Sequence, residues 1–314
     1  MGKRLYIPPP ARYTFVMLTD AHCHPWDLAG VFPGAEDELC RLKVFCATSA
    51  LNREDFSYHE SLVRKKGLPL VLCFAVHPQF PALEIRQVLT RQEGSIFEGT
   101  APPLGTAGAS PQGSRFSFRD SLALLETLAA EGRLDAVGET GFDLYNEAYR
   151  ATEKIQDELF AVHRETALAK GLPLVLHVRR AMHKIFALSG DLKKLPALIF
   201  HSYSGTVNEA LALLRRGINA YFSFGAAITK NHKEAQRCCA LLPADRILLE
   251  TDAPYQPLQG ASFSHWDDLP VILAAAARLR EEAGNTASPE SLEAVLEANF
   301  FAAFEVKKDD RKIL

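Results

Sequence analysis

The sequence lacks any segment that would enter or cross a membrane. No run of about 18 apolar residues, the length that a transmembrane helix needs, occurs in its 314 residues. The first fifteen residues hold Lys3, Arg4 and three prolines, without the apolar centre and small-residue cleavage pattern of a signal peptide. Because 47% of the residues are hydrophobic, the chain can form a large core. We therefore expect a soluble, globular protein.

Paired cysteine motifs are absent as well. None of the six cysteines forms a CxxC pair, and several lie in apolar segments such as KVFCAT at 43–48 and LVLCFAV at 70–76. Such positions are typical of buried, reduced thiols rather than of a disulfide framework. This cysteine usage favours a cytoplasmic protein.

Positive charge is not in excess. The formal net charge is −3, so no global basic field attracts a polyanion. If the protein binds nucleic acid, the positive charge must be concentrated at the binding site.

What the sequence does contain is a regular alternation of strand-like and helix-like segments. Most of the apolar segments are continuous rather than alternating, which is typical of parallel strands buried on both faces. Eight strands are predicted, at 15–20, 42–48, 69–76, 134–140, 172–178, 197–202, 219–224 and 246–251. Eight helices are predicted, at 54–66, 119–131, 152–170, 180–189, 206–216, 231–241, 267–282 and 289–304.

This order predicts an α/β fold, a (β/α)₈ TIM barrel, with a doubly wound open sheet as the competing architecture. The barrel is expected to be a single domain at 15–305, after an N-terminal extension at 1–14 and before a C-terminal tail at 306–314. The segment 94–117 is rich in Gly, Pro and Ser, and we interpret it as a long loop inserted after the third strand.

Metal-binding side chains follow most of the predicted strands. In a parallel barrel all strands end at the same rim, so these side chains should converge although they lie far apart in the sequence. The opening motif DAHCH places two histidines one residue apart, which puts both on one face of an extended chain. The expected metal ligands are His22, His24, Glu139, His177, His201 and Asp252.

These imidazoles and carboxylates are donors that Zn²⁺, Mn²⁺ or Mg²⁺ accept. Six donors exceed the three that one catalytic zinc takes, so we expect two divalent ions per subunit, bridged by a carboxylate. Each residue also has a structural interpretation: Asp252 could cap a turn, and Glu139 could fix a bend between glycines. His77 could be a ligand, could orient one, or could face the substrate. Asp20, Asp143 and Glu250 are expected to support the site rather than to bind metal.

Six segments carry a resemblance to a known family. They are DAHCH (20–24), AVHPQ (75–79), VGETGFD (137–143), LPLVLHVRRA (172–181), HSYSG (201–205) and RILLETDAPY (246–255). In this order they resemble the motifs of the TatD-type metal-dependent deoxyribonucleases, which belong to the amidohydrolase-like TIM-barrel superfamily. The resemblance extends from about residue 15 to about residue 305.

The resemblance implies a particular ligand set and activity. One ion would be held by His22, His24, Glu139 and Asp252, and the other by Glu139, His177 and His201, with Glu139 bridging. The implied reaction is hydrolysis of DNA phosphodiester bonds, often from the 3′ end and commonly supported by Mg²⁺. The carbamylated lysine of some relatives is not expected, because Glu139 stands at that strand end.

The expected catalytic residues are Glu139, Asp252 and Arg179. Asp252 is the candidate to accept the proton of the attacking water, and Arg179 is placed to neutralise a phosphate oxygen, although a salt bridge at the rim would also explain it. Substrate contacts are expected from His77, Arg179 and Arg180. The expected partner is DNA, above all single-stranded ends, with no membrane and no obligate protein partner.

The sequence departs from the family pattern at two places, and two other functions remain open. The sequence HVRRA stands where HSRDA is more typical of the family, and the segment 256–270 diverges from its usual arginine-rich continuation. A hydrolase of a small ester, lactone or amide is therefore the first alternative, and a non-catalytic interaction protein that keeps a structural metal is the second. A nucleophilic serine hydrolase is disfavoured because SYSG lacks the G-x-S-x-G pattern.

Overall fold

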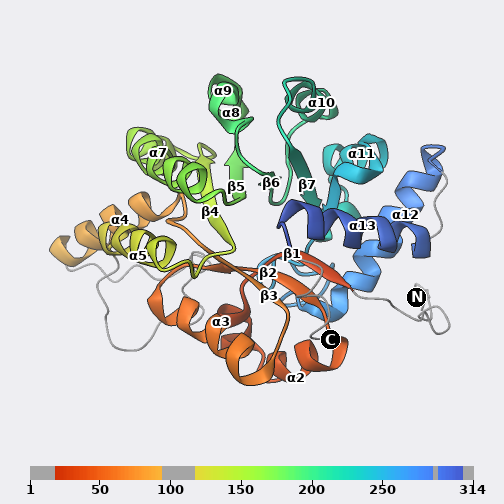
Figure 1. The fold of residues 1–314 in the computed structure, drawn as a ribbon, viewed down its shortest axis with the longest axis horizontal. Helices are drawn as coiled ribbons and strands as arrows, with labels where there is room; N and C mark the ends of the chain where they lie inside the picture. Colours follow the sequence, from red (N-terminus) through yellow and green to blue (C-terminus); the bar gives the residue numbers. More distant parts are fainter. Residues whose placement is uncertain (1–17, 94–116, 286–288, 307–314) are drawn as a thin grey trace.

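Eight parallel strands follow one another around the sheet in chain order, and the helices lie outside them (Figure 1). The computed structural model describes residues 18–93, 117–285 and 289–306. The TIM barrel is therefore confirmed, and all eight predicted strands are present to within a few residues. The strands are β1 Thr19–Cys23, β2 Phe45–Ala50, β3 Leu70–Phe74, β4 Ala136–Asp143, β5 Leu174–Arg179, β6 Leu198–Phe200, β7 Ala220–Phe224 and β8 Ile247–Leu249.

The helices alternate with the strands, with some additions to the predicted set. Those near predicted positions are α3 Arg53–Lys66, α5 Phe118–Ala130, α7 Glu153–Lys170, α8 Met182–Ala187, α9 Ser189–Leu192, α10 Val207–Arg215, α11 Lys233–Leu241, α12 Leu269–Glu282 and α13 Pro289–Ala303. The sequence did not reveal α1 Pro25–Val31, α2 Ala35–Leu42, α4 Phe80–Glu93 or α6 Glu147–Arg150. Short 3₁₀ helices are η1 Ala226–Thr229, η2 Ala244–Arg246 and η3 Trp266–Asp268.

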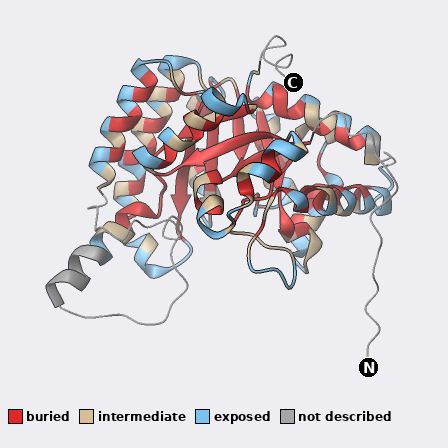
Figure 2. Ribbon diagram, turned by 90° about the horizontal axis from the view of Figure 1, so that it is seen from below, coloured by how far each residue is buried: buried red, intermediate tan, exposed pale blue. Residues whose placement is uncertain are grey.

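Two apolar layers hold the barrel together. The larger lies between the strands and the surrounding helices, and Figure 2 shows buried residues along the strands and on the helix faces turned toward them. The smaller fills the barrel itself and includes Val71, Val175 and Leu248. Phe300 of α13 and Phe304, directly after this helix, belong to this inner cluster, so α13 closes one end of the barrel. The polar centre is left for the other end, where the strands finish.

The barrel closes between β8 and β1 at the rim that carries the predicted site. The carbonyl of His22 accepts a hydrogen bond from the Asp252 N–H at 2.9 Å, and the His24 N–H donates to the Ala253 carbonyl at 2.8 Å. The Thr251 hydroxyl donates to Asp20 Oδ2 at 2.6 Å. The first and last motifs of the sequence are thus joined directly.

Some expectations fall on residues that are not described. The start of the first predicted strand, the extension at 1–14 and the loop at 94–117 lie wholly or almost wholly outside the described residues, as does most of the tail at 306–314. The loop was expected between the third strand and the helix at 119–131, and helix α4 also lies in that interval. Within the described part of the chain, no helix combines the length and apolar character needed to cross a bilayer.

Candidate metal centre

The six predicted ligands lie together at the carboxyl end of the barrel. Glu139 is central: its Oε2 lies 3.2 Å from His22 Nε2, and its Oε1 lies 2.7 Å from His177 Nδ1. His201 Nε2 lies 3.6 Å from the same Oε1. Asp252 Oδ1 lies 3.4 Å from His24 Nε2. Two groups of donors therefore meet around one carboxylate, which is the arrangement a bridged pair of ions requires.

The strands are irregular where they present these ligands. Ala136 and Val175 face the inside of the barrel, and His177, two residues after Val175, faces the same way. By the same alternation Glu139 would point outward from β4. The register of β4 against β5 shifts between Val137 and Thr140, and this irregularity turns Glu139 inward.

Two glycines allow β4 to approach β5 closely at this point. A Cβ atom on Gly138 would lie 2.5 Å from the Cβ of Val175, and one on Gly141 would lie 2.3 Å from the His177 carbonyl oxygen. Gly141 also has a φ of +131°, which favours glycine. The glycines on both sides of Glu139 are therefore needed to place the carboxylate beside His177.

The histidine pair meets in a different way from the one expected. Strand β1 ends at Cys23, and His24 occupies the position before helix α1 rather than a strand position. The register of β1 against β2 also shifts between Asp20 and Cys23. The prediction that both histidines share a face of one extended strand is therefore wrong in detail, but their Nε2 atoms still lie 3.2 Å apart.

Several buried polar atoms at this centre have no hydrogen-bond partner among the described residues. They are His24 Nδ1, His77 Nε2, Glu139 Oε2 and Asp252 Oδ1. Leaving a buried polar atom unsatisfied costs about 1–3 kcal/mol. They include one oxygen of each shared carboxylate and the His77 nitrogen that lies 3.3 Å from Glu139, so the residues present fit divalent cations.

The charges at the centre are strongly coupled. Burial alone would raise the pKa of Glu139, but the imidazoles of His77, His201 and His22 lower it well below its usual range. Burial would likewise lower the pKa of His201, yet the carboxylates of Glu250 and Glu139 raise it to about 10. The carboxylates are therefore ionised, and the positive charge that faces them comes from protons or from metal ions.

The carboxylates that were expected to support the site do so. Asp143 Oδ2 lies 3.1 Å from His177 Nε2 and accepts a hydrogen bond from the Gln79 amide at 2.7 Å. Glu250 Oε1 lies 3.1 Å from His201 Nδ1 and accepts hydrogen bonds from the Ser202 N–H and hydroxyl. Such partners fix the orientation of a ligating imidazole.

His77 joins the centre rather than its surface. Its Nε2 lies 3.3 Å from Glu139 Oε1, and its side chain is fully buried. Together with Glu139 and His177 it forms a group whose donor atoms lie within 4.8 Å of one another. This position suits a ligand, or a residue that orients Glu139, better than a group that meets the substrate at the rim.

Arg179 and Arg180 lie at the rim. The Arg179 side chain is 41% exposed, and its Nη1 lies 3.6 Å from Asp143 Oδ2, so the rim ion pair is present. Arg180 has a left-handed backbone with a φ of +56°, and its Nη1 donates to the Tyr145 carbonyl at 3.2 Å. Both guanidinium groups are therefore at the entrance to the centre, as a contact with phosphate requires.

Sequence reasoning missed His163, a fully buried residue of α7. Its Nε2 accepts a hydrogen bond from the Val76 N–H at 3.1 Å, and its Nδ1 lies 2.6 Å from Thr140 Oγ1. The ladder between β3 and β4 ends at Phe74 and Val137, so this imidazole joins the two strands beyond that point. Burial lowers the pKa of His163 to about 3, and the ring is neutral. Its two hydrogen-bonding partners, Val76 and Thr140, directly adjoin His77 and Glu139 in the sequence.

Gln256 is a second missed residue, from the divergent segment. Its amide donates to Asp252 Oδ2 at 2.9 Å and also contacts the Ser202 hydroxyl. The segment 256–270 therefore reaches the candidate centre with an uncharged donor. No motif in the sequence pointed to this contact.

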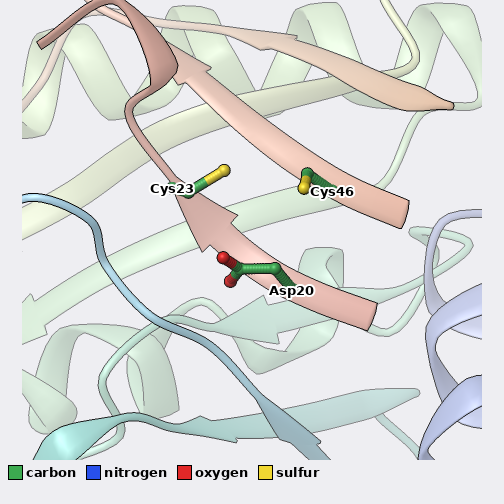
Figure 3. A group of neighbouring side chains, drawn as sticks. All are labelled: Asp20, Cys23 and Cys46. Atoms are coloured by element: carbon green, nitrogen blue, oxygen red, sulfur yellow. The ribbon is translucent and has the colours of Figure 1, made fainter. Parts of the chain in front are cut away.

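A third donor group lies on β1 and β2 beside the centre. Figure 3 shows Asp20, Cys23 and Cys46 between the two neighbouring strands. Asp20 Oδ1 already accepts hydrogen bonds from two backbone N–H groups, and Oδ2 accepts one from Thr251. Burial raises the pKa of both thiols, which keeps them protonated. This group therefore fits the expectation of buried, reduced cysteines and a supporting Asp20.

The last donor group joins the divergent segment to helix α2. Glu38 lies 3.0 Å from His265 Nδ1 and accepts a hydrogen bond from the Asp267 N–H at 3.0 Å. Asp267 also forms an ion pair with Arg41 at 2.7 Å. These groups satisfy one another, so they fasten the segment rather than leave donors for an ion.

Comparison with known proteins gives a consistent result. Residues 19–305 match the model of the family described as TatD related DNase. The 3′-5′ ssDNA/RNA exonuclease TatD of Cronobacter sakazakii is 33% identical over 203 residues, which are 62% of this chain and 74% of that protein. A protein of the same name from Cronobacter turicensis is 36% identical over 151 residues, 48% of this chain and 57% of that protein.

A solved structure resembles the fold over nearly its whole length. The crystal structure of YjjV, a TatD homologue from Escherichia coli K12, has a TM-score of 0.71 and covers 92% of this chain and 98% of its own. The two sequences are 22% identical, so this likeness concerns the fold alone.

Proposed function

The chain belongs to the TatD related DNase family, and from this membership we propose that it is a metal-dependent nuclease that removes nucleotides from the 3′ end of single-stranded DNA. It is a hydrolase of phosphodiester bonds. The relatives named as 3′-5′ ssDNA/RNA exonucleases support both the direction and the substrate. Reduced, unpaired cysteines, five of the six buried, fit the cytoplasmic location expected from the sequence.

One observation carries the proposal. Three groups of buried donors, from six strand ends, share the Glu139 carboxylate or the Asp252 carboxylate, and several of their atoms lack any other partner. A purely structural network would satisfy these atoms within the protein.

We assign the ligands as the sequence predicted. As the resemblance to the family implies, His22, His24, Glu139 and Asp252 would hold one divalent ion, and Glu139, His177 and His201 the other. His77 is a further donor, because its donor atom groups with those of Glu139 and His177. The donor atom of His201 groups with those of His22 and Glu139, between the two proposed positions. Zn²⁺, Mn²⁺ and Mg²⁺ all suit this mixture of imidazole and carboxylate. When bound, such a pair makes water acidic enough to attack at neutral pH and stabilises the charge on the phosphate.

The remaining steps belong to side chains of the chain itself. Asp252 accepts the proton of the attacking water, because its carboxylate is ionised: burial alone would raise its pKa, but His201 and His24 lower it. Arg179 neutralises a phosphate oxygen from the rim with its planar guanidinium group. Glu139 holds the two groups of ligands in one place.

The test is a nuclease assay on purified protein with 3′-end-labelled single-stranded DNA. We expect stepwise shortening from the 3′ end that stops with chelator and returns with Mg²⁺ or Mn²⁺. A parallel assay on small esters, lactones and amides decides between this function and the alternative. Hydrolysis of those compounds without any cleavage of DNA would overturn the proposal.

A further inference from the structure

The ring of Tyr145 contacts two arginine side chains at the rim of the centre. It directly follows the loop residue Leu144 after β4, and 47% of it is exposed. The guanidinium carbon of Arg179 lies 4.1 Å from the centroid of its ring, and that of Arg180 lies 4.6 Å away. Both distances are within the range of cation–π attraction. One exposed aromatic ring thus fixes two positive charges.

The stack is attached rigidly to the strands that carry Glu139 and His177. The Tyr145 N–H donates to Asp143 Oδ1 at 2.8 Å, and the Asp143 N–H donates to the buried Gln156 side chain at 2.8 Å. The Leu144 N–H donates to the Arg179 carbonyl at 2.9 Å. Because Asp143 also lies beside His177, the stack sits directly next to the candidate metal centre.

The charge and the backbone of Arg180 are unusual for a purely structural residue. Among the described residues, Arg180 pairs with no carboxylate, and its side chain contacts the ring and the carbonyl of Tyr145. Its left-handed φ of +56° is uncommon outside glycine and strains the backbone of an arginine. The chain therefore keeps an unneutralised guanidinium group in a strained position beside the site.

We propose that Tyr145, Arg179 and Arg180 form a subsite for the phosphate backbone of a single-stranded nucleic acid, in which Arg179 faces the phosphate that is cleaved and Arg180 binds the phosphate next to it. The proposal rests on the nuclease function proposed above and adds to it a residue that no motif assigned. Tyr145 is the positioning residue, because it holds both guanidinium planes ready to form paired hydrogen bonds with phosphate oxygens. The contact involves no base edge, so it is independent of sequence.

The chain offers a matched control for this stack. The guanidinium carbon of Arg216 lies 4.8 Å from the ring centroid of Phe186, and Arg216 Nη1 donates to the Phe186 carbonyl at 2.9 Å. This pair has the same ring contact and the same backbone contact as Arg180 with Tyr145, but it joins α8 to the end of α10 and takes no part in the centre. Phe186→Ala therefore measures what loss of such a stack does elsewhere.

The test compares Tyr145→Ala, Tyr145→Phe and Phe186→Ala on two substrates, a single-stranded oligonucleotide and a small aryl phosphodiester without flanking nucleotides. For Tyr145→Ala we expect kcat/KM on the oligonucleotide to fall about tenfold more than on the small ester, mainly through KM. Tyr145→Phe keeps the ring and should stay within about twofold of wild type, as should Phe186→Ala. Equal losses on both substrates, or no loss with Tyr145→Ala, would overturn the subsite.

Salt dependence gives a second readout that a structural role would not change. Arg180→Asn removes the charge with a residue that tolerates a left-handed backbone. We expect the slope of log KM against log salt concentration to fall by about 0.7, the value for one lost contact to a single strand. An unchanged slope contradicts the phosphate contact. Failure of the wild-type protein to cleave either substrate refutes the nuclease function instead, so the two failures are distinguishable.

Discussion

Replacing His163 by glutamine tests how the barrel holds its centre in place. In the folded protein burial lowers the pKa of this imidazole from 6.5 to about 3, so the folded state does not bind a proton between these values. The unfolded chain does bind one below pH 6.5. Acid therefore favours the unfolded state, and the stability contributed by the neutral ring is lost as the pH falls from 6.5 toward 3. The slope is about 1.4 kcal/mol per pH unit.

The expected magnitude follows from these two pKa values. Between pH 7.5 and pH 5 the wild-type free energy of unfolding should fall by about 2 kcal/mol because of His163 alone. His163→Gln has no titrating group, and its amide can still accept from the Val76 N–H and donate to Thr140 Oγ1. Relative to wild type, the free energy of unfolding of His163→Gln should therefore be about 2 kcal/mol more favourable to the folded state at pH 5 than it is at pH 7.5.

Urea unfolding followed by circular dichroism, with chelator present so that metal binding does not contribute, measures this difference at both pH values. His163→Leu serves as the comparison, because it leaves the Val76 N–H and the Thr140 hydroxyl unsatisfied. It should cost about 2–5 kcal/mol at pH 7.5, where His163→Gln costs less. A difference between wild type and His163→Gln that is the same at both pH values would refute the assignment of a neutral, buried imidazole.

Three further substitutions test other parts of the account. Glu139→Gln should reduce turnover on single-stranded DNA by more than about 100-fold, which is the loss expected when a residue that only orients a metal ligand is replaced. The circular dichroism spectrum should stay unchanged. Wild-type rates would exclude the bridging role. Glu250→Gln should weaken metal binding about 10- to 100-fold, measured by calorimetric titration with Mn²⁺, because Glu250 orients His201. Phe300→Ala should lower the free energy of unfolding by about 3–5 kcal/mol, because Phe300 is fully buried in the cluster that closes the barrel.

The strands, and the convergence of the donor side chains at their ends, could be predicted from the sequence because both leave a regular signal. A strand buried on both faces must be apolar throughout, and a polar residue directly after it then stands out, as His201 does after Leu198–Phe200. Helix α1 escaped notice for a physical reason. Helix α1 has only seven residues, and its sequence PWDLAGV contains Pro and Gly, so it carries no clear helical period.

The detailed geometry could not be predicted, because it depends on contacts between distant segments. The shift that turns Glu139 inward requires β4 to approach β5 at Gly138 and Gly141, which no local pattern reveals. His163 is a lone histidine within a long helix, and nothing in its neighbours indicates that it joins β3 to β4. Gln256 lies in the segment 256–270, which diverges from the usual pattern of the family, so its contact with Asp252 had no motif to predict it.

The central claim is that strand-end imidazoles and carboxylates hold a pair of divalent ions that cleave nucleic acid. The most direct measurement is elemental analysis of the purified protein together with the 3′-end-labelled DNA assay on the same preparation, with and without chelator. We predict a metal-to-chain ratio near two and shortening of the DNA from its 3′ end that chelator abolishes. A chain that binds no divalent metal, or that shortens DNA equally well after chelation, would contradict the account.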